Sequence, residues 1–212
     1  MEAMYKVRDS LQDKIDKKER SDLLFLFVLG LIIIAMTVMV FLYSAVFFNV
    51  VVDGPSMQPT LYTGDVLVAS KNKKAERGSL IVIDGVKWDS VNKEYVWLIK
   101  RAIAFGGDTV QIKEGSVYVN GDKLDEPYIS IPNSTVDYDD IYDWNEPTVV
   151  AEGQVFYLGD NRTNSSDSRV YGTCSEENIV GVVSDWSLSA RGFNKFLYDT
   201  GKIFRGEKKS YN

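Results

Sequence analysis

The stretch LLFLFVLGLIIIAMTVMVFLYSAVFF, from Leu23 to Phe48, contains no charged side chain. A helix that spans a bilayer needs only about 20 predominantly apolar residues, so this stretch is long enough to cross. A cleaved secretory signal is the competing interpretation, but its apolar core would be about 7 to 15 residues long, with a small-residue cleavage site after it. The stretch therefore predicts one retained transmembrane α-helix, which divides the chain into a short leading segment and a larger following part.

The Lys and Arg side chains around this stretch predict its direction. Six of them precede it, and none follows it before Lys71. Because cytoplasmic flanks carry the excess of Lys and Arg, we expect the N-terminus to be cytoplasmic. The expected parts are a cytoplasmic segment (1–22), a membrane anchor (23–48), an extracytoplasmic domain (49–190) and a basic, aromatic tail (191–212).

Composition excludes several kinds of chemistry. The chain has no histidine, which excludes a Ser-His-Asp triad, a Cys-His dyad and histidine-ligated zinc within it. Cys174 is the sole cysteine, so an internal disulfide and a multi-cysteine metal site are excluded as well. A net charge of −6 argues against a nucleic-acid partner, because phosphate binding needs a basic surface. No cofactor or metal is expected, and any catalytic base must be Lys, Asp, Glu or Tyr.

The part after the anchor is predicted to be all-β. Its apolar segments are short, rich in β-branched and aromatic residues and separated by turn residues. They include VLVAS, SLIVIDGV, YVWLIKRAI, SVYV and QVFYLG. Asn120 and Gly121 predict a tight hairpin turn after SVYV. We expect antiparallel sheets around a small barrel-like or sandwich-like core, and an exposed acidic, aromatic loop from Pro132 to Glu146.

The segment DGPSMQPTL, from Asp53 to Leu61, contains the first candidate for catalysis. Pro55 and Pro59 fix φ on both sides of Ser56, so the segment should be a stiff turn that presents one hydroxyl in a defined direction. A serine in such a turn is, taken alone, most often only a turn residue.

Lys100, in the segment YVWLIKRAIAFGGD, is the second candidate. If Tyr95 to Ala104 is a strand, every second residue shares a face with Lys100, and those residues are Val96, Leu98, Ala102 and Ala104. An apolar setting disfavours the ammonium form and lowers the pKa of lysine, which a lysine base requires. The alternative is an ordinary lysine whose amine reaches solvent.

The segment GDNRTNSSDSR, from Gly159 to Arg169, follows an apolar strand and is the third candidate. Its ion pairs would join Asp167 to Arg169, or Asp160 to Arg162. Its hydroxyls, on Ser165, Ser166 and Ser168, could orient a neutral lysine amine. A purely structural loop held by internal hydrogen bonds is the alternative.

Taken together, the segments resemble bacterial type I signal peptidases, which use a Ser/Lys dyad. Four motifs of that family occur in order after the anchor: GPSMQPTL, GDVLVASK, KRAIAFGGD and GDNRTNSSDSR. The resemblance covers about Phe47 to Trp186. It implies a membrane-bound serine endopeptidase that cleaves signal peptides from exported preproteins after small residues at positions −3 and −1. The implied partners are those preproteins and membrane lipid.

The resemblance also implies roles for individual residues. Ser56 would attack the scissile carbonyl, Lys100 would take its proton, and Ser165 would orient the Lys100 amine. Met57 would lie beside the site, and the bracing residues would be Asp160, Asp167 and Arg169, with a structural role for Arg162. Some relatives carry a hydroxyl residue two positions before the nucleophile, where this chain has Gly54, as in a Gram-positive-like branch. The oxyanion would then rely on the Ser56 backbone N–H and another group.

Two other interpretations remain open on the sequence alone. A self-cleaving Ser/Lys protease of the repressor-processing type would share the dyad, but such proteins are soluble and often carry a DNA-binding domain. A membrane-tethered β-domain could also be a non-catalytic binding factor, although the presence of Lys100 argues against it.

Overall fold

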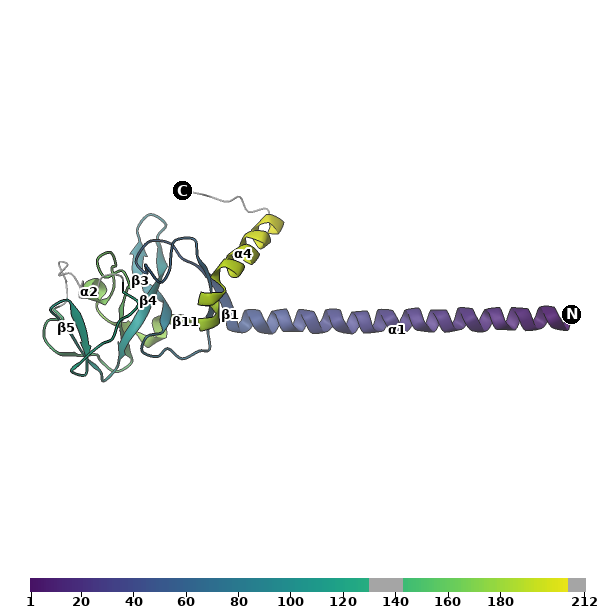
Figure 1. Cartoon of the computed structure of the whole chain (residues 1–212), viewed down its shortest axis with the longest axis horizontal. Helices are drawn as coiled ribbons and strands as arrows, with labels where there is room; N and C mark the ends of the chain where they lie inside the picture. The colour runs from purple at the N-terminus through teal and green to yellow at the C-terminus, as the bar shows by residue number, and fades with distance from the viewer. Residues whose placement is uncertain (130–142, 206–212) are drawn as a thin grey trace. The chain divides into compact units, whose positions relative to one another are not determined.

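The structure is a computed structural model that describes residues 1–129 and 143–205. The chain forms two compact units, Met1–Val46 and the part from Phe47 onward. The first unit is one helix, α1 (Glu2–Val46), drawn in purple and blue in Figure 1. Its segment Gln12–Val46 is long and apolar enough to cross a membrane, judged by length and composition.

The predicted apolar helix therefore forms, with two differences at its ends. It begins within the charged segment that we had assigned to a separate part, and it ends at Val46, two residues before the predicted end. Phe47 and Phe48 instead begin the first strand, because they pair with Ser70 and Ala69. Along α1, large apolar side chains from Leu23 to Tyr43 are exposed, as expected of a helix whose solvent is lipid.

The second unit is built from two sheets in which every strand pair is antiparallel. The larger has the order β1-β2-β11-β3-β4-β9-β10, and the smaller has the order β7-β6-β5-β8. The larger sheet comprises β1 (Phe47–Val51), β2 (Val66–Ser70), β3 (Leu80–Asp89), β4 (Glu94–Phe105), β9 (Gln154–Leu158), β10 (Cys174–Ser175) and β11 (Ile179–Val183). The smaller comprises β5 (Thr109–Lys113), β6 (Ser116–Val119), β7 (Asp122–Lys123) and β8 (Thr148–Val149). The prediction of an antiparallel all-β domain is confirmed.

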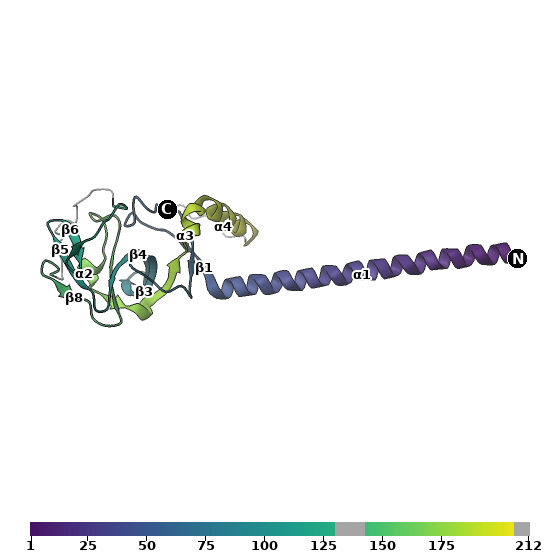
Figure 2. The ribbon, with the colours of Figure 1, turned by 60° about the horizontal axis from the view of Figure 1, so that its bottom comes forward.

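Short helices occupy the connections near the end of the chain. They are α2 (Ser168–Tyr171), the 3-10 turn η1 (Glu176–Asn178) and α3 (Asp185–Ser189), followed by the longer α4 (Arg191–Arg205). Figure 2 shows α2 beside the small sheet at one end of the domain, and α3 and α4 at the end where β1 begins. The basic, aromatic tail is thus helical as far as Arg205, and its Phe193, Phe196 and Leu197 are exposed.

Local sequence signals are confirmed at one turn and wrong at one residue of a predicted loop. Asn120 and Gly121 both have positive φ, 56° and 86°, as a two-residue hairpin turn requires. Most of the expected acidic loop, residues 130–142, lies outside the described residues. Trp144, at its end, is not exposed but buried, because its ring packs edge-on against Phe156 at a centroid distance of 4.5 Å.

Strand β4 lies in the core and positions the site. Its neighbours are β3 along Glu94 to Arg101, and β9 from Arg101 onward. The two faces of β4 are both buried at its end. Ala102, Ile103 and Ala104 are all fully buried. Ile103 and Ala104 belong to the hydrophobic core beneath the small sheet, whereas Ala102 packs in a core of the larger sheet.

Candidate active site

The turn that carries Ser56, named the nucleophile turn for the predicted role of this serine, lies between β1 and β2 and is fixed from two sides. Within it, Gln58 N–H donates to the Pro55 carbonyl (3.1 Å), and Leu61 N–H donates to the Met57 carbonyl (2.9 Å). Asn161 holds the turn from outside, because its backbone N–H donates to the Ser56 carbonyl at 3.0 Å. The Asn161 side-chain amide also donates to the Pro55 carbonyl at 3.2 Å. The Ser56 side chain is therefore presented by a rigid backbone.

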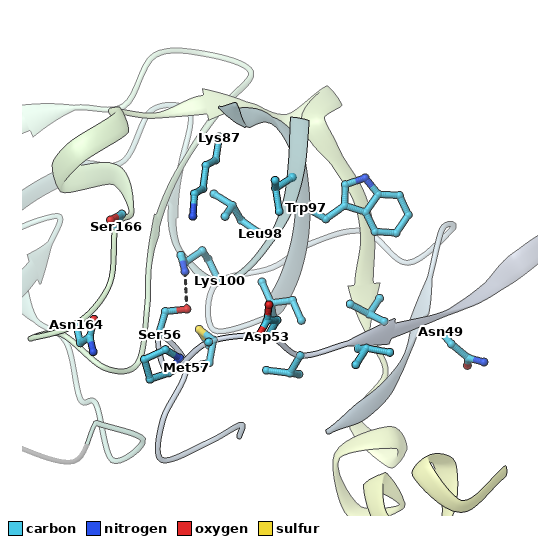
Figure 3. A pocket seen from close by; sticks show the side chains of 17 residues that line it. Asn49, Asp53, Ser56, Met57, Lys87, Trp97, Leu98, Lys100, Asn164 and Ser166 are labelled. Atoms are coloured by element: carbon cyan, nitrogen blue, oxygen red, sulfur yellow. Dashed lines mark hydrogen bonds between the residues drawn. The ribbon is translucent and has the colours of Figure 1, made fainter. Parts of the chain in front are cut away.

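Lys100 reaches this serine from β4. Its Nζ donates a hydrogen bond to Ser56 Oγ over 2.8 Å (Figure 3). The lysine is 3% exposed, opposite the fully buried Ile81 and between Leu98 and Ala102 on its own strand face. Val96, which we had counted among its apolar surroundings, is more exposed, at 36%. The sequence thus identified the two interacting side chains, and Ile81 supplies part of the burial.

Burial lowers the pKa of Lys100 to about 8, because desolvation disfavours the ammonium form. Asp167 and Asp160 oppose this effect by attracting the charge, whereas Lys87 adds to it by repulsion. With a pKa of about 8, about one lysine in ten is neutral at pH 7, against fewer than about one in a thousand for an unperturbed amine. A neutral amine within hydrogen-bond distance of a hydroxyl can act as a general base for that hydroxyl.

A cleft of about 500 Å³ opens beside the two side chains. One wall is β1 and the nucleophile turn, the other is Val96 to Lys100 of β4, and Met57 lies buried next to Ser56. Among the described strands, β1 pairs only with β2, and β4 gains its second partner, β9, only from Arg101. Both walls thus have a backbone edge available to pair with an extended peptide.

A buried ion pair braces the GDNRTNSSDSR segment. The Asp167 carboxylate accepts hydrogen bonds from Arg169 Nε (2.8 Å) and Nη2 (2.9 Å), and both side chains are at most 1% exposed. Asp167 also accepts from the Gly159 N–H at 2.9 Å, and Arg169 Nη1 donates to the Arg162 carbonyl at 2.8 Å. The structure therefore contains the predicted pairing of Asp167 with Arg169. This ion pair holds together the loop that lies beside the nucleophile turn.

The alternative pairing of Asp160 with Arg162 is wrong. Asp160 instead accepts from Arg101 Nε (2.8 Å) and Nη2 (2.6 Å), and also from the Thr60 hydroxyl. Arg162 pairs with Glu126 and donates from Nε to the Gly159 carbonyl at 3.0 Å. The Asp160 carboxylate thus connects the nucleophile turn, through Thr60, with β4, through Arg101.

Ser165 lies near the backbone of Ser56, although its predicted bond to Lys100 is not present in the structure. Its Oγ is buried and forms no hydrogen bond with any residue in the described ranges, 1–129 and 143–205. Gly159 lies between this hydroxyl and the Ser56 backbone: a Cβ on Gly159 would meet the Ser56 carbonyl oxygen at 2.5 Å and would also clash with Ser165. The orienting role of Ser165 remains a prediction.

The backbone conformation of Gly54 explains why this position, two residues before Ser56, carries no side-chain donor. Its φ is +89°, a conformation that residues with a Cβ rarely adopt. The Ser56 backbone N–H, in contrast, donates to no acceptor among the residues that the structure describes. It is therefore available for a ligand oxygen.

Several residues of the site were missed by sequence reasoning. Arg101, Asn161 and Gly159 all lie inside the quoted motifs, next to residues that we had singled out, so their position was a usable signal. Thr60 also lies in the nucleophile motif. Lys87 lines the cleft but belongs to no motif, and nothing in the sequence indicated it.

Comparison with known proteins gives the same family across most of the chain. Residues 25–186 match the family model described as signal peptidase, peptidase S26. A signal peptidase I of Bacillus licheniformis is 38% identical over 144 residues, which are 65% of this chain and 74% of that protein. Signal peptidase I V of Bacillus subtilis (strain 168) is 33% identical over 172 residues, 76% of this chain and 96% of that protein. Signal peptidase IB of Staphylococcus aureus (strain MRSA252) is 35% identical over 159 residues, 68% of this chain and 80% of that protein.

The geometry and the comparisons agree: a serine hydroxyl hydrogen-bonded to a buried lysine lies within the matched residues, beside a cleft bordered by strand edges. The chain belongs to the signal peptidase family, peptidase S26.

Proposed function

We propose that Ser56 and Lys100 carry out the cleavage of signal peptides from secreted preproteins that membership of this family implies. The observation that supports this assignment most is the 2.8 Å hydrogen bond between Lys100 Nζ and Ser56 Oγ, made by a lysine that is 3% exposed. Burial keeps a fraction of this amine neutral, and the hydrogen bond places its nitrogen where it can accept the serine proton.

The reaction proceeds in two halves. Ser56 Oγ bonds to the scissile carbonyl carbon while its proton passes to neutral Lys100. The ammonium then gives that proton to the leaving amine, the C–N bond breaks, and the signal peptide remains as an ester on Ser56. In the second half Lys100 takes a proton from water, the hydroxide adds to the ester carbonyl, and the proton returns to Ser56 Oγ as the C–O bond breaks.

The backbone N–H of Ser56 is proposed to stabilise the oxyanion that forms in each half. A backbone N–H aimed at the developing negative charge lowers the barrier more than it stabilises the substrate. Support comes from its lack of an acceptor among the described residues and from the rigid turn that holds it. Asp160, Asp167 and Arg169 brace the site through buried ion pairs and do not themselves take part in proton transfer.

The substrate is proposed to bind as an extended strand between β1 and β4. Alternate side chains of an extended peptide face one wall, which accounts for a requirement at positions −1 and −3 and for tolerance at −2. Near the nucleophile, the cleft is lined by Met57, Leu98 and Ile99. Apolar walls of this kind suit the small side chains expected at these two positions.

A mass-spectrometric assay on a preprotein tests the assignment. Purified wild-type protein should release the mature protein with a single new N-terminus after small residues at −3 and −1, and Ser56→Ala should release none. Processing by Ser56→Ala would exclude this serine as nucleophile. Shortening of the enzyme alone, with the preprotein intact, would indicate self-cleavage, and binding without cleavage would indicate a non-catalytic domain.

For the membrane arrangement we propose a single-pass anchor, α1, with a cytoplasmic N-terminus and an extracytoplasmic catalytic domain. The proposal rests on the apolar helix and on the excess of Lys and Arg before it. Protease added to intact protoplasts that express the protein should digest the domain that contains Ser56. A domain that is degraded only after lysis would contradict this topology.

A further inference from the structure

A bulge in β3 brings a second lysine to the cleft. Ile83 lies opposite Leu98, but the next paired residue, Lys87, lies opposite Val96, so four steps along β3 match two along β4. Gly85, with φ +76°, lies within this irregular segment. Residues directly opposite each other in an antiparallel pair project to the same face. Lys87 therefore projects from the face of β4 that carries Leu98 and Lys100.

Lys87 lines the cleft, and its side chain is exposed. Figure 3 shows its side chain extending past Leu98 in the direction of Lys100. Among the side chains that the structure describes, no Asp or Glu forms an ion pair with Lys87. Of the described residues that line the cleft, Asp53 is the one that is acidic. Asp89 attracts the Lys87 charge without forming an ion pair with it. A cation beside apolar cleft walls, with no described carboxylate within ion-pair distance, is suited to bind an anionic group of a ligand.

The path of the substrate identifies which side chain would meet Lys87. A signal peptide has its apolar segment on the amino side of the cleavage site, and β1 follows directly on the apolar segment of this chain. The amino side of the substrate should therefore run along β1 and away from Ser56. This direction leads toward Val96, because Phe48 at the start of β1 contacts Trp97 at a ring-centroid distance of 5.4 Å. Val96 is four residues from Lys100, and an extended peptide advances by the same step as a strand. With position −1 beside Lys100, position −5 lies beside Val96 and Lys87.

We propose that Lys87 forms an anion-selective subsite that favours an acidic side chain at position −5 of the preprotein and disfavours a basic one there. The inference deepens the proposed function and rests on the assignment of Ser56 and Lys100, since these two residues set the register. Positions −4 and −6 face the other way in an extended peptide and should be insensitive to Lys87.

Peptide substrates with one substitution at a time test this subsite in the full-length protein. Gln, Glu and Lys are placed in turn at −4, −5 and −6, and kcat/KM is compared within each enzyme, so that changes in basal activity cancel. For wild type, kcat/KM of the peptide with Glu at −5 should exceed that of the Gln peptide by about two- to fivefold, which is the effect expected of an exposed ion pair. The peptide with Lys at −5 should have a lower kcat/KM than the Gln peptide. The preference should shrink as salt rises, because a partly exposed pair is screened.

Charge reversal gives the decisive comparison. Lys87→Glu should invert the preference at −5, so that the peptide with Lys has the highest kcat/KM. Lys87→Gln should abolish the preference for either charge. Lys113→Glu, at an exposed residue on β5 outside the cleft, is the matched control and should keep the wild-type order. An unchanged order in Lys87→Glu, or an equal charge effect at −4 and −5, would overturn the proposal. Failure of the catalytic assignment is distinguishable, because Ser56→Ala would then still cut the Gln peptides.

Discussion

Lys100→Arg is expected to lose processing activity almost completely, although it keeps the positive charge. The guanidinium stays protonated at any workable pH and cannot accept the Ser56 proton. General base catalysis contributes about 10²- to 10⁴-fold, so kcat/KM for a preprotein should fall by at least about a hundredfold. Initial rates of cleavage of a labelled preprotein, measured beside Ser56→Ala, give the size of the loss.

The control for this change is Lys113→Arg, which makes the same substitution at an exposed residue of β5 and should retain wild-type kinetics. A thermal melt of Lys100→Arg separates loss of the base from loss of the fold, because the larger guanidinium must fit where the lysine is 3% exposed. A folded Lys100→Arg variant with substantial activity would show that another group takes the proton.

Gly159→Ala is the second change with a large expected effect. The new Cβ would lie 2.5 Å from the Ser56 carbonyl oxygen, closer than real Cβ atoms come, so the nucleophile turn must shift. Misplacement of a nucleophile by about 1 Å can cost about a hundredfold in rate, and we expect a loss of that order in kcat with an intact fold. Gly192→Ala is the control, because nothing lies within 4 Å of the Cβ that it adds.

Ser165→Ala tests the contribution of the Ser165 hydroxyl separately from that of the Ser56 backbone, which also lies next to Gly159. This variant removes the hydroxyl without adding volume, and it should lower kcat by about two- to tenfold if that hydroxyl orients the Lys100 amine, the value of one hydrogen bond. Equal activity of Ser165→Ala and wild type would show that the Ser165 hydroxyl does not orient the Lys100 amine.

Local patterns in the sequence predicted the elements that depend on neighbouring residues. Short apolar segments rich in β-branched and aromatic residues predicted β2, β4 and β9, and the positive φ of Asn120 and Gly121 followed from their residue types. The pairing of Ser56 with Lys100 was predicted from the family motifs, since no local pattern connects residues 44 positions apart.

Features that depend on strand register could not be predicted in this way. Asp160 pairs with Arg101 rather than with nearby Arg162, because the register of β4 and β9 places Arg101 opposite Leu158, two residues before Asp160. The β3 bulge that directs Lys87 into the cleft is likewise a matter of register. Trp144 was assigned to an exposed loop because its sequence neighbours are acidic. Its burial depends instead on contact with Phe156, which is distant in the sequence.

The pH dependence of kcat/KM tests the central claim most directly, because it reports the protonation state of the base in the free enzyme. Only the neutral Lys100 amine can accept the serine proton, so the rate should rise with pH and level off above the pKa of about 8. At pH 7 the rate should be about one tenth of the plateau. Lys100→Arg should show no such rise at any measurable residual rate. A wild-type rate that is flat from pH 6 to pH 10, or that rises only near the ordinary lysine pKa, would contradict a buried lysine base.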